Sequence, residues 1–312
     1  MGHDSNTATA PGGASADLRR APRQPTASDR RPAASGGMSP AERQLLPAMP
    51  LHAITALHGE TGLRERFAIE IAAFPDADRQ RLEQALDLAA RLHAADRRQR
   101  EPYLHHVLRV ATRIISHYHV HDADVVCAAL LHDAVKDHAD DLAPGGGQQE
   151  ALTALAGLFG SRVAELVSAV TNPPYESGRD HHAQYREHVA ASLETSPWTR
   201  VIKISDFTDN GIGLIHTTGP RLSRLASKYA PLVPVLRDLI GRPDTPLDPP
   251  SRNAFSPNSS KRSSGSRQSC RRATWQASAG EASSQAAVER PQLLNALAAV
   301  RGCGGRFGNG AP

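Results

Sequence analysis

The sequence lacks a hydrophobic run long enough to cross a bilayer. Its longest apolar stretch, residues 125–131, is far shorter than the roughly 20 residues that a membrane-spanning helix needs. The first residues, MGHDSNTATAPGG, contain no apolar core of the kind found in secretory signal peptides. We therefore expect a cytoplasmic protein without a membrane partner.

Cysteines and aromatic residues are also scarce. The three cysteines, Cys127, Cys270 and Cys303, follow no spacing pattern, which argues against a disulfide framework and for a reducing compartment. Aromatic residues make up 4% and hydrophobic residues 39% of the 312 residues. These shares predict long polar segments beside one ordinary hydrophobic core. The net charge of +4 comes largely from terminal arginines, so it indicates no specific nucleic-acid partner.

Composition divides the chain into four parts. Residues 1–44, rich in proline, alanine and arginine, and residues 243–312, rich in serine and arginine, are predicted to be disordered tails. Residues 45–77 are predicted to form a leading helical segment, and residues 78–242 the folded domain. Neither tail has the length and apolar pattern that a second enzymatic domain would need.

Apolar residues within 78–242 recur with helical spacing, and no segment alternates with a period of two. We therefore predict an all-α domain, a compact bundle of several helices. Pro102 suits the first turn of one helix, and Asp122 is placed to cap the next, whose VVCAALL stretch is apolar on nearly all sides and should be buried. Further helices are predicted at 148–158, 161–171, 180–195, 199–210 and 220–240, with Gly211 and Gly213 ending the fourth of them.

His132 and Asp133 directly follow the buried stretch and carry the first indication of chemistry. A carboxylate beside an imidazole is costly there unless it is compensated, and a divalent metal ion such as Mn, Fe, Co or Zn would compensate it. For this pair alone, a helix that emerges into solvent is the better interpretation. His106 and Asp206 change the balance, because each lies on a neighbouring, otherwise apolar helix face. Together the four residues form a ligand set that leaves positions for water and substrate.

Three motifs occur in an order and spacing that resemble the HD-domain hydrolases of the RelA/SpoT type, including their small stand-alone forms. They are Arg97-Arg98 … Pro102-Tyr103-x-x-His106, Ala129-Leu130-Leu131-His132-Asp133-x-x-x-Asp137 and Val201-Ile-Lys-x-x-Asp206-x-x-x-Asn210. The resemblance covers residues 78–240. It implies an all-α fold, one manganese ion (Mn²⁺) and removal of the 3′-pyrophosphate from the small-molecule alarmone (p)ppGpp, guanosine 3′,5′-bis(diphosphate).

The resemblance also assigns roles to residues. It implies metal ligation by His106, His132, Asp133 and Asp206. It implies that Asn210 contacts the ribose and that Arg97 or Arg98 lies near the base and phosphates. Lys203 and Tyr103 complete the predicted substrate-binding set. For each arginine taken singly, a solvated charge run is an equally good interpretation.

One position departs from the family pattern. The family reads x-x-Glu-Asp after the His-Asp pair, whereas this sequence reads Ala-Val-Lys136-Asp137. A lysine cannot serve as a base at neutral pH unless burial lowers its pKa strongly, and its charge repels a metal ion. Three interpretations stay open: Asp137 alone acts on the water with reduced activity, Lys136 binds phosphate in a non-catalytic nucleotide-binding module, or the gene is damaged. An HD hydrolase of another nucleotide is a further alternative, and the oligomeric state is left open.

Overall fold

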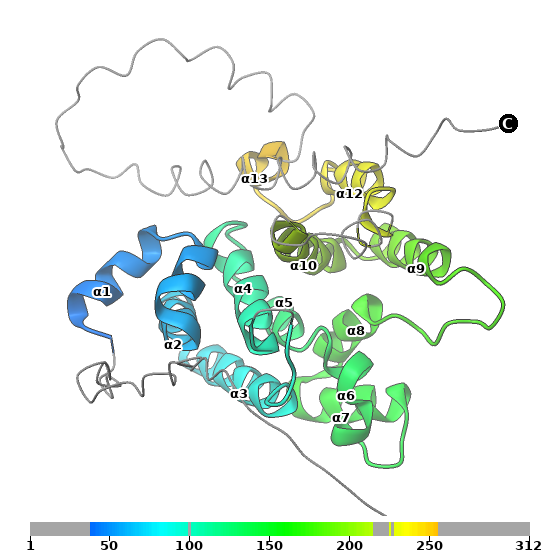
Figure 1. Ribbon diagram of the computed structural model, residues 1–312, viewed down its shortest axis with the longest axis horizontal. Helices are drawn as coiled ribbons and strands as arrows, with labels where there is room; N and C mark the ends of the chain where they lie inside the picture. Colours follow the sequence, from blue (N-terminus) through cyan, green and yellow to red (C-terminus); the bar gives the residue numbers. More distant parts are fainter. Residues whose placement is uncertain (1–37, 99–100, 215–224, 226–227, 255–312) are drawn as a thin grey trace, which may run out of the picture. The chain divides into compact units, whose positions relative to one another are not determined.

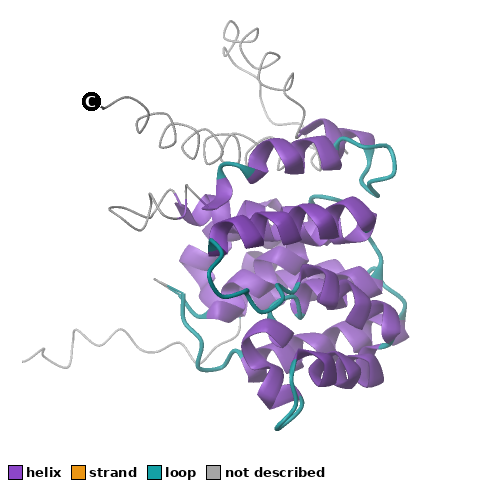
Figure 2. Cartoon of the chain, turned by 90° about the vertical axis from the view of Figure 1, so that its right-hand side faces the viewer, coloured by secondary structure: helices purple, strands orange, loops and turns teal. Residues whose placement is uncertain are grey.

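The computed structural model describes residues 38–98, 101–214, 225 and 228–254 (Figure 1). Throughout these ranges the chain forms helices and loops without a strand, apart from an isolated β-bridge between Arg97 and Pro102 (Figure 2). The predicted all-α class is therefore confirmed. The helices are α1 (Pro40–Leu45), the 3₁₀ helix η2 (Leu46–Ala48), α2 (Leu51–Ile71), α3 (Asp76–Leu92), α4 (Tyr103–Ser116), α5 (Ala123–Leu130), α6 (Ala134–Leu142), α7 (Gln148–Phe159), α8 (Ser161–Val170), α9 (His181–Thr195), α10 (Pro197–Leu214), α12 (Leu232–Ile240) and α13 (Pro249–Ala254).

Helix α4 is the central element of the packing. It is buried over nearly its whole length and contacts α2, α3, α5 and α10 (Figure 1). Its apolar stripe includes Val107, Val110 and Ile114, all fully buried. Its polar residues His106 and Arg109 are buried as well, so they require partners on the neighbouring helices.

Helix α5 is buried from end to end, as its VVCAALL stretch predicts. The carboxylate of Asp122 accepts hydrogen bonds from the backbone amides of Asp124 and Val125, which confirms the expected helix cap. The helix ends at Leu130, and a turn follows before α6 begins. His132 therefore lies in a turn between two helices that packing holds on both sides.

The leading segment is more extensively helical than expected. Helix α2 runs from Leu51 to Ile71 and bends at Gly59, whose φ of 59° is a conformation that favours glycine. Its buried residues, among them Leu63 and Phe67, join the same hydrophobic core as α4. The leading segment is thus part of the folded unit.

Two helices fall within segments that were predicted to be disordered, and this is a correction to both boundaries. Helix α1 starts at Pro40 because Ser39 and Glu42 form a reciprocal capping box. Helix α13 starts at Pro249, where Asp248 accepts the amide of Ser251. Residues 1–37 and 255–312 of the predicted tails lie outside the described residues.

Two further expectations about helices were wrong. Helix α6 was not predicted, because it is short and its backbone leaves helical geometry at His138 (φ −136°, ψ 33°). Helix α10 continues to Leu214 through Gly211 and Gly213, since glycine weakens a helix by only about 1 kcal/mol and does not forbid it. None of the helices in the described ranges is both long and apolar enough to span a bilayer. The cytoplasmic location stays a prediction.

Candidate metal centre

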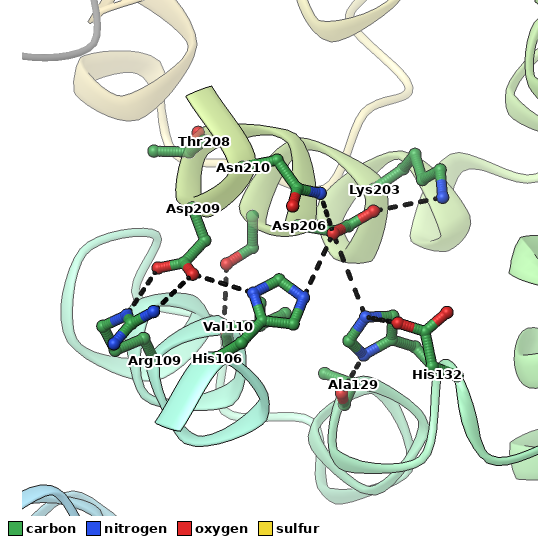
Figure 3. Close-up of polar contacts among 12 residues, drawn as sticks. His106, Arg109, Val110, Ala129, His132, Lys203, Asp206, Thr208, Asp209 and Asn210 are labelled. Atoms are coloured by element: carbon green, nitrogen blue, oxygen red, sulfur yellow. Dashed lines mark hydrogen bonds and ion pairs between the residues drawn. The ribbon is translucent and has the colours of Figure 1, made fainter. Parts of the chain in front are cut away.

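Helix α4, the α5–α6 turn and helix α10 bring His106, His132 and Asp206, three of the four predicted ligands, together (Figure 3). Nε2 of His106 lies 3.4 Å from Oδ1 of Asp206, and Nε2 of His132 lies 3.9 Å from the same oxygen. Oδ2 of Asp133 lies 3.0 Å from Nε2 of His132. His106, His132 and Asp206 are all buried. Residues separated by up to 100 positions in the chain thus present two nitrogens and two carboxylates to one small volume.

The hydrogen bonds of the two Nδ1 atoms determine the neutral tautomer of each imidazole ring. Nδ1 of His132 lies 2.8 Å from the carbonyl oxygen of Ala129, which can only accept, so in the neutral ring Nδ1 carries the hydrogen and Nε2 carries the lone pair. Nδ1 of His106 lies 2.8 Å from a carboxylate oxygen of Asp209 and donates in the same way. In their neutral forms, both rings therefore direct the Nε2 lone pair toward Asp206.

This arrangement fits a divalent metal ion. Nε2 of His132 is buried and has no hydrogen-bond partner among the residues that the structure describes. Burial alone would lower the pKa of His132, but the charge of Asp133 raises it, so the surroundings attract positive charge to this point. Two neutral imidazole nitrogens and two carboxylates suit Mn, Fe, Co or Zn.

Asp209 contacts a predicted metal ligand, and the sequence analysis missed it. It is buried and holds His106 by the Nδ1 hydrogen bond, while its Oδ1 accepts from Nε of Arg109 at 2.8 Å and from Arg113 at 3.3 Å. Burial would raise the pKa of Asp209, but Arg109 and the bond from His106 hold it well below its usual range. Carboxylates that orient a metal-binding histidine tune the metal affinity. The sequence held one signal for this pairing, because two polar pairs have the same spacing. One pair is His106 and Arg109 on α4, and the other is Asp206 and Asp209 on α10.

Glu101 completes the surroundings of Arg109 and was also missed. Its two carboxylate oxygens accept from Nη2 and Nη1 of Arg109 at 2.6 and 2.9 Å. Burial alone would raise the pKa of Glu101, but hydrogen bonds from His105 and Arg109 lower it to about 2. A buried guanidinium thus lies between two carboxylates, and one of them supports a predicted metal ligand.

A cleft of about 740 Å³ opens beside the centre. His106, Asp133 and Asp206 line it together with every residue of the predicted substrate-binding set, namely Arg97, Arg98, Tyr103, Lys203 and Asn210. Lys136 and Lys228 add two more cations to its walls. The cleft therefore combines carboxylates at the metal centre with a surrounding group of lysine and arginine side chains.

Several of these residues are hydrogen-bonded to the predicted metal ligands themselves. Asn210 donates to Oδ1 of Asp206 at 2.6 Å and accepts from Arg98, and Lys203 donates to Oδ2 of Asp206 at 3.1 Å (Figure 3). The hydroxyl of Tyr103 donates to Asp133. Lys203, Asn210 and Tyr103 thus hold the predicted metal ligands in place as well as facing the cleft.

Lys136 lies between two carboxylates. Its Nζ is 3.2 Å from Oδ1 of Asp133 and 3.0 Å from Oδ1 of Asp137. Burial would lower the pKa of Lys136, but the charges of Asp133 and Asp137 raise it, so the side chain keeps its positive charge and cannot act as a base. Asp137, the predicted catalytic carboxylate, is engaged by this lysine.

The sequence analysis did not predict the aromatic side chains that line one part of the cleft. Tyr185 and Tyr229 line the cleft, and Nζ of Lys228 lies 4.0 Å from the centre of the Tyr185 ring and 5.2 Å from that of Tyr229. Burial lowers the pKa of Lys228, and nearby Lys203 lowers it further. These three residues lie outside the three sequence motifs, so the sequence pattern did not identify them. They provide flat apolar surface beside the cationic group.

Comparison with known proteins agrees with this geometry. Residues 85–195 match the family model of an HD domain, the fold of metal-dependent phosphohydrolases. A guanosine-3′,5′-bis(diphosphate) 3′-pyrophosphohydrolase of Aquifex aeolicus is 29% identical over 56% of this chain and 24% of its own length. The enzyme of the same description from Drosophila melanogaster, MESH1, is 29% identical over 45% of this chain and 71% of its own.

A solved structure of a metazoan ortholog of SpoT that hydrolyzes ppGpp matches 62% of this chain and 98% of its own, at 25% identity and a TM-score of 0.45. At that TM-score the structural match supports no conclusion about this chain. The chain spans a quarter or less of the bacterial relatives that it matches. The resemblance drawn from the three motifs is nevertheless confirmed, since the matched region contains the first two of them.

Proposed function

We propose that this HD-domain protein, similar to the (p)ppGpp 3′-pyrophosphohydrolases, hydrolyses the 3′-pyrophosphate of a guanosine polyphosphate alarmone with the help of one divalent metal ion, Mn²⁺. One observation carries the proposal: the Nε2 atoms of His106 and His132 converge on Asp206 beside a cleft lined by lysine and arginine side chains. The reaction adds water to a phosphorus atom of the 3′-pyrophosphate. It releases pyrophosphate and leaves guanosine diphosphate.

The charge of the cleft matches this substrate. A guanosine bearing diphosphates at two positions is strongly anionic. Arg97 and Arg98 face the cleft from the loop before α4, and Lys228 faces it from a second segment. Guanidinium and ammonium groups form charge-assisted hydrogen bonds to phosphate oxygens, roughly twice as strong as neutral ones. The rings of Tyr185 and Tyr229 supply a surface for the guanine base. Asn210, fixed between Arg98 and Asp206, presents its amide toward the ribose.

The proposed metal ligands and the proposed catalytic side chains have different roles in the reaction. His106, His132, Asp133 and Asp206 would hold the ion, which supplies a Lewis acid for the phosphoryl oxygen and an activated water. Asp137 takes the proton of the attacking water, once Lys136 turns from Asp137 to a phosphate. Lys203 keeps Asp206 ionised and oriented.

A non-catalytic alarmone-binding module is the second candidate, and Lys136 favours it. The lysine places a fixed positive charge 3.2 Å from the proposed ligand Asp133 and occupies Asp137. Such a site retains a cationic cleft for phosphates while it lacks a free base. This candidate predicts saturable ppGpp binding with no pyrophosphate release.

The test uses the full chain with Mn²⁺ and ppGpp, with pyrophosphate and guanosine diphosphate measured separately. The hydrolase form predicts equal amounts of both products from the wild type and none above background from His132→Ala. No release at high enzyme concentration, with binding retained, would replace the hydrolase by the binding module. A panel of other nucleoside polyphosphates is the control for substrate, and faster turnover of one of them would move the proposal to that nucleotide.

A further inference from the structure

A second group of metal-ligating side chains lies apart from the proposed centre. Helix α3 is followed by His93, the loop after it carries Asp96, and helix α6 carries His138. Nδ1 of His93 and Nε2 of His138 each lie 2.7 Å from Oδ2 of Asp96, and the two nitrogens are 3.2 Å apart. Three elements thus aim one potential ligand atom each at a common point.

The rings are held so that this convergence is maintained. Nδ1 of His138 lies 2.9 Å from a carboxylate oxygen of Asp141, which leaves Nε2 directed at Asp96. A carboxylate behind a histidine is the usual support of a metal-binding ring. The ring of His93 is stacked on that of Tyr103, with centroids 4.7 Å apart.

The three distances approach those of a tetrahedral ion. Zinc–nitrogen and zinc–oxygen bonds of about 2.0–2.2 Å place neighbouring ligand atoms roughly 3.3 Å apart, so the two sides of 2.7 Å need to open by about 0.6 Å and the side of 3.2 Å by about 0.1 Å. His93 is buried, whereas the side chain of Asp96 is 34% exposed. The exposed side provides a path from solvent and room for a water ligand.

We propose that His93, Asp96 and His138 form a second divalent-metal site, of the zinc type with two imidazoles and one carboxylate. Its function is structural: the ion joins the end of α3, the loop toward α4 and the bend in α6. This site goes beyond the proposed hydrolysis and does not depend on it.

The position of Tyr103 links the second site to the first. Its ring stacks on His93, and its hydroxyl donates to Asp133, one of the four residues proposed to hold the catalytic ion. An ion that fixes the His93 ring therefore also limits the movement of Tyr103. We infer that occupancy of the second site orders Asp133.

The alternative occupant is a proton. Burial alone would lower the pKa of His138, but the hydrogen bonds to Asp141 and Asp96 raise it, so a protonated His138 can form ion pairs with both carboxylates. That ion-paired state needs no metal. Metal stoichiometry distinguishes the two, because a metal ion is retained on the protein and can be counted.

The experiment compares bound zinc per chain in five full-length proteins. Each is stripped with chelator, saturated with zinc, passed through a gel-filtration column and analysed by mass spectrometry for metal. We expect the wild type and the surface control His121→Ala to bind one ion more than His138→Ala and one more than His132→Ala. The double variant His132→Ala/His138→Ala should lose both. Because His132→Ala removes only the first site, failure of the proposed hydrolase and failure of this site are separable.

Equal zinc content in His138→Ala and the wild type would overturn the proposal and leave a protonated ion pair only. Asp96→Asn keeps the shape of a partly exposed side chain and guards against misfolding of the histidine variant. It should lose the same ion while its circular dichroism spectrum stays that of the wild type. Zinc should raise the melting temperature of His132→Ala, and an unchanged melting temperature there would also contradict the site.

Discussion

Nδ1 of His106 donates a hydrogen bond of 2.8 Å to the buried carboxylate of Asp209, and this bond directs Nε2 of the same ring toward Asp206, 3.4 Å away. The pair joins two facing helices at the centre of the molecule. A carboxylate in this position both fixes the tautomer of the imidazole and increases its basicity. The metal affinity of the centre should therefore depend on a residue that never touches the ion.

Asp209→Asn tests this dependence. The amide keeps the shape of the side chain but removes the charge, so we expect metal affinity to fall about 10–100-fold, the range typical of outer carboxylates. A calorimetric titration with Mn²⁺ measures the change. Glu101→Gln is the matched control, since it removes another carboxylate from Arg109 without touching His106. Equal losses of affinity in the two variants would show that Asp209 acts through the arginine rather than through the histidine.

Lys136→Glu restores a carboxylate where the sequence has a cation. We expect pyrophosphate release to rise by about 10²-fold, at the lower end of what general acid–base catalysis contributes, because Asp137 is freed and a second base is added. Lys136→Gln separates the two causes, since it frees Asp137 without adding a base. If both variants turn over ppGpp at the wild-type rate, then Lys136 does not limit catalysis.

Lys228→Gln should weaken substrate binding selectively. Its ammonium lies in the cleft against Tyr185 and Tyr229, so phosphate binding should lose one charge-assisted hydrogen bond. A bond of that kind contributes about 1.5–3 kcal/mol, which corresponds to a rise in KM of roughly 10–100-fold. Mn²⁺ affinity, measured on the same samples, should stay unchanged. A loss of metal binding instead would place Lys228 at the metal centre.

The sequence predicted the parts of the site that lie in recognisable motifs. His106, His132, Asp133 and Asp206 stood out because each is polar within an apolar stretch, and the order of the motifs grouped them. Asp209 was not distinguished from a solvated aspartate, since its burial depends on how α4 and α10 face each other. Sequence spacing gives the face of a residue on its own helix but not the residue opposite.

The helices, likewise, were predictable where their apolar residues recur with regular spacing. Helices such as α7, α8 and α9 were placed within a few residues, and the cap at Asp122 was correct. Helix α6 was missed because its polar sequence, AVKDHADDL, has few apolar positions to set a period. That short helix carries both Lys136 and His138, so the pairing of Lys136 with Asp133 and the second histidine cluster emerged only from the three-dimensional arrangement.

Glu101 gives a pH dependence with a definite sign. Its pKa falls from 4.5 to about 2 on folding, so its contribution to the free energy of unfolding is complete above pH 4.5 and is lost as the pH falls through 2. Glu101→Gln should lower that free energy by about 1–3 kcal/mol at pH 7, and the difference from the wild type should shrink below pH 4.5. Urea unfolding at a series of pH values measures it. A difference that stays constant down to pH 3 would mean that Arg109 does not depend on the charge of Glu101.

The metal centre itself is tested most directly by following free Mn²⁺ with electron paramagnetic resonance while it is titrated into wild-type protein, His132→Ala and the control His121→Ala. The account predicts a saturable site in the wild type and the control that disappears in His132→Ala, because Nε2 of His132 is the buried nitrogen without a hydrogen-bond partner in the described part of the chain. The same binding curve in all three proteins would contradict a metal ion held by His106, His132, Asp133 and Asp206.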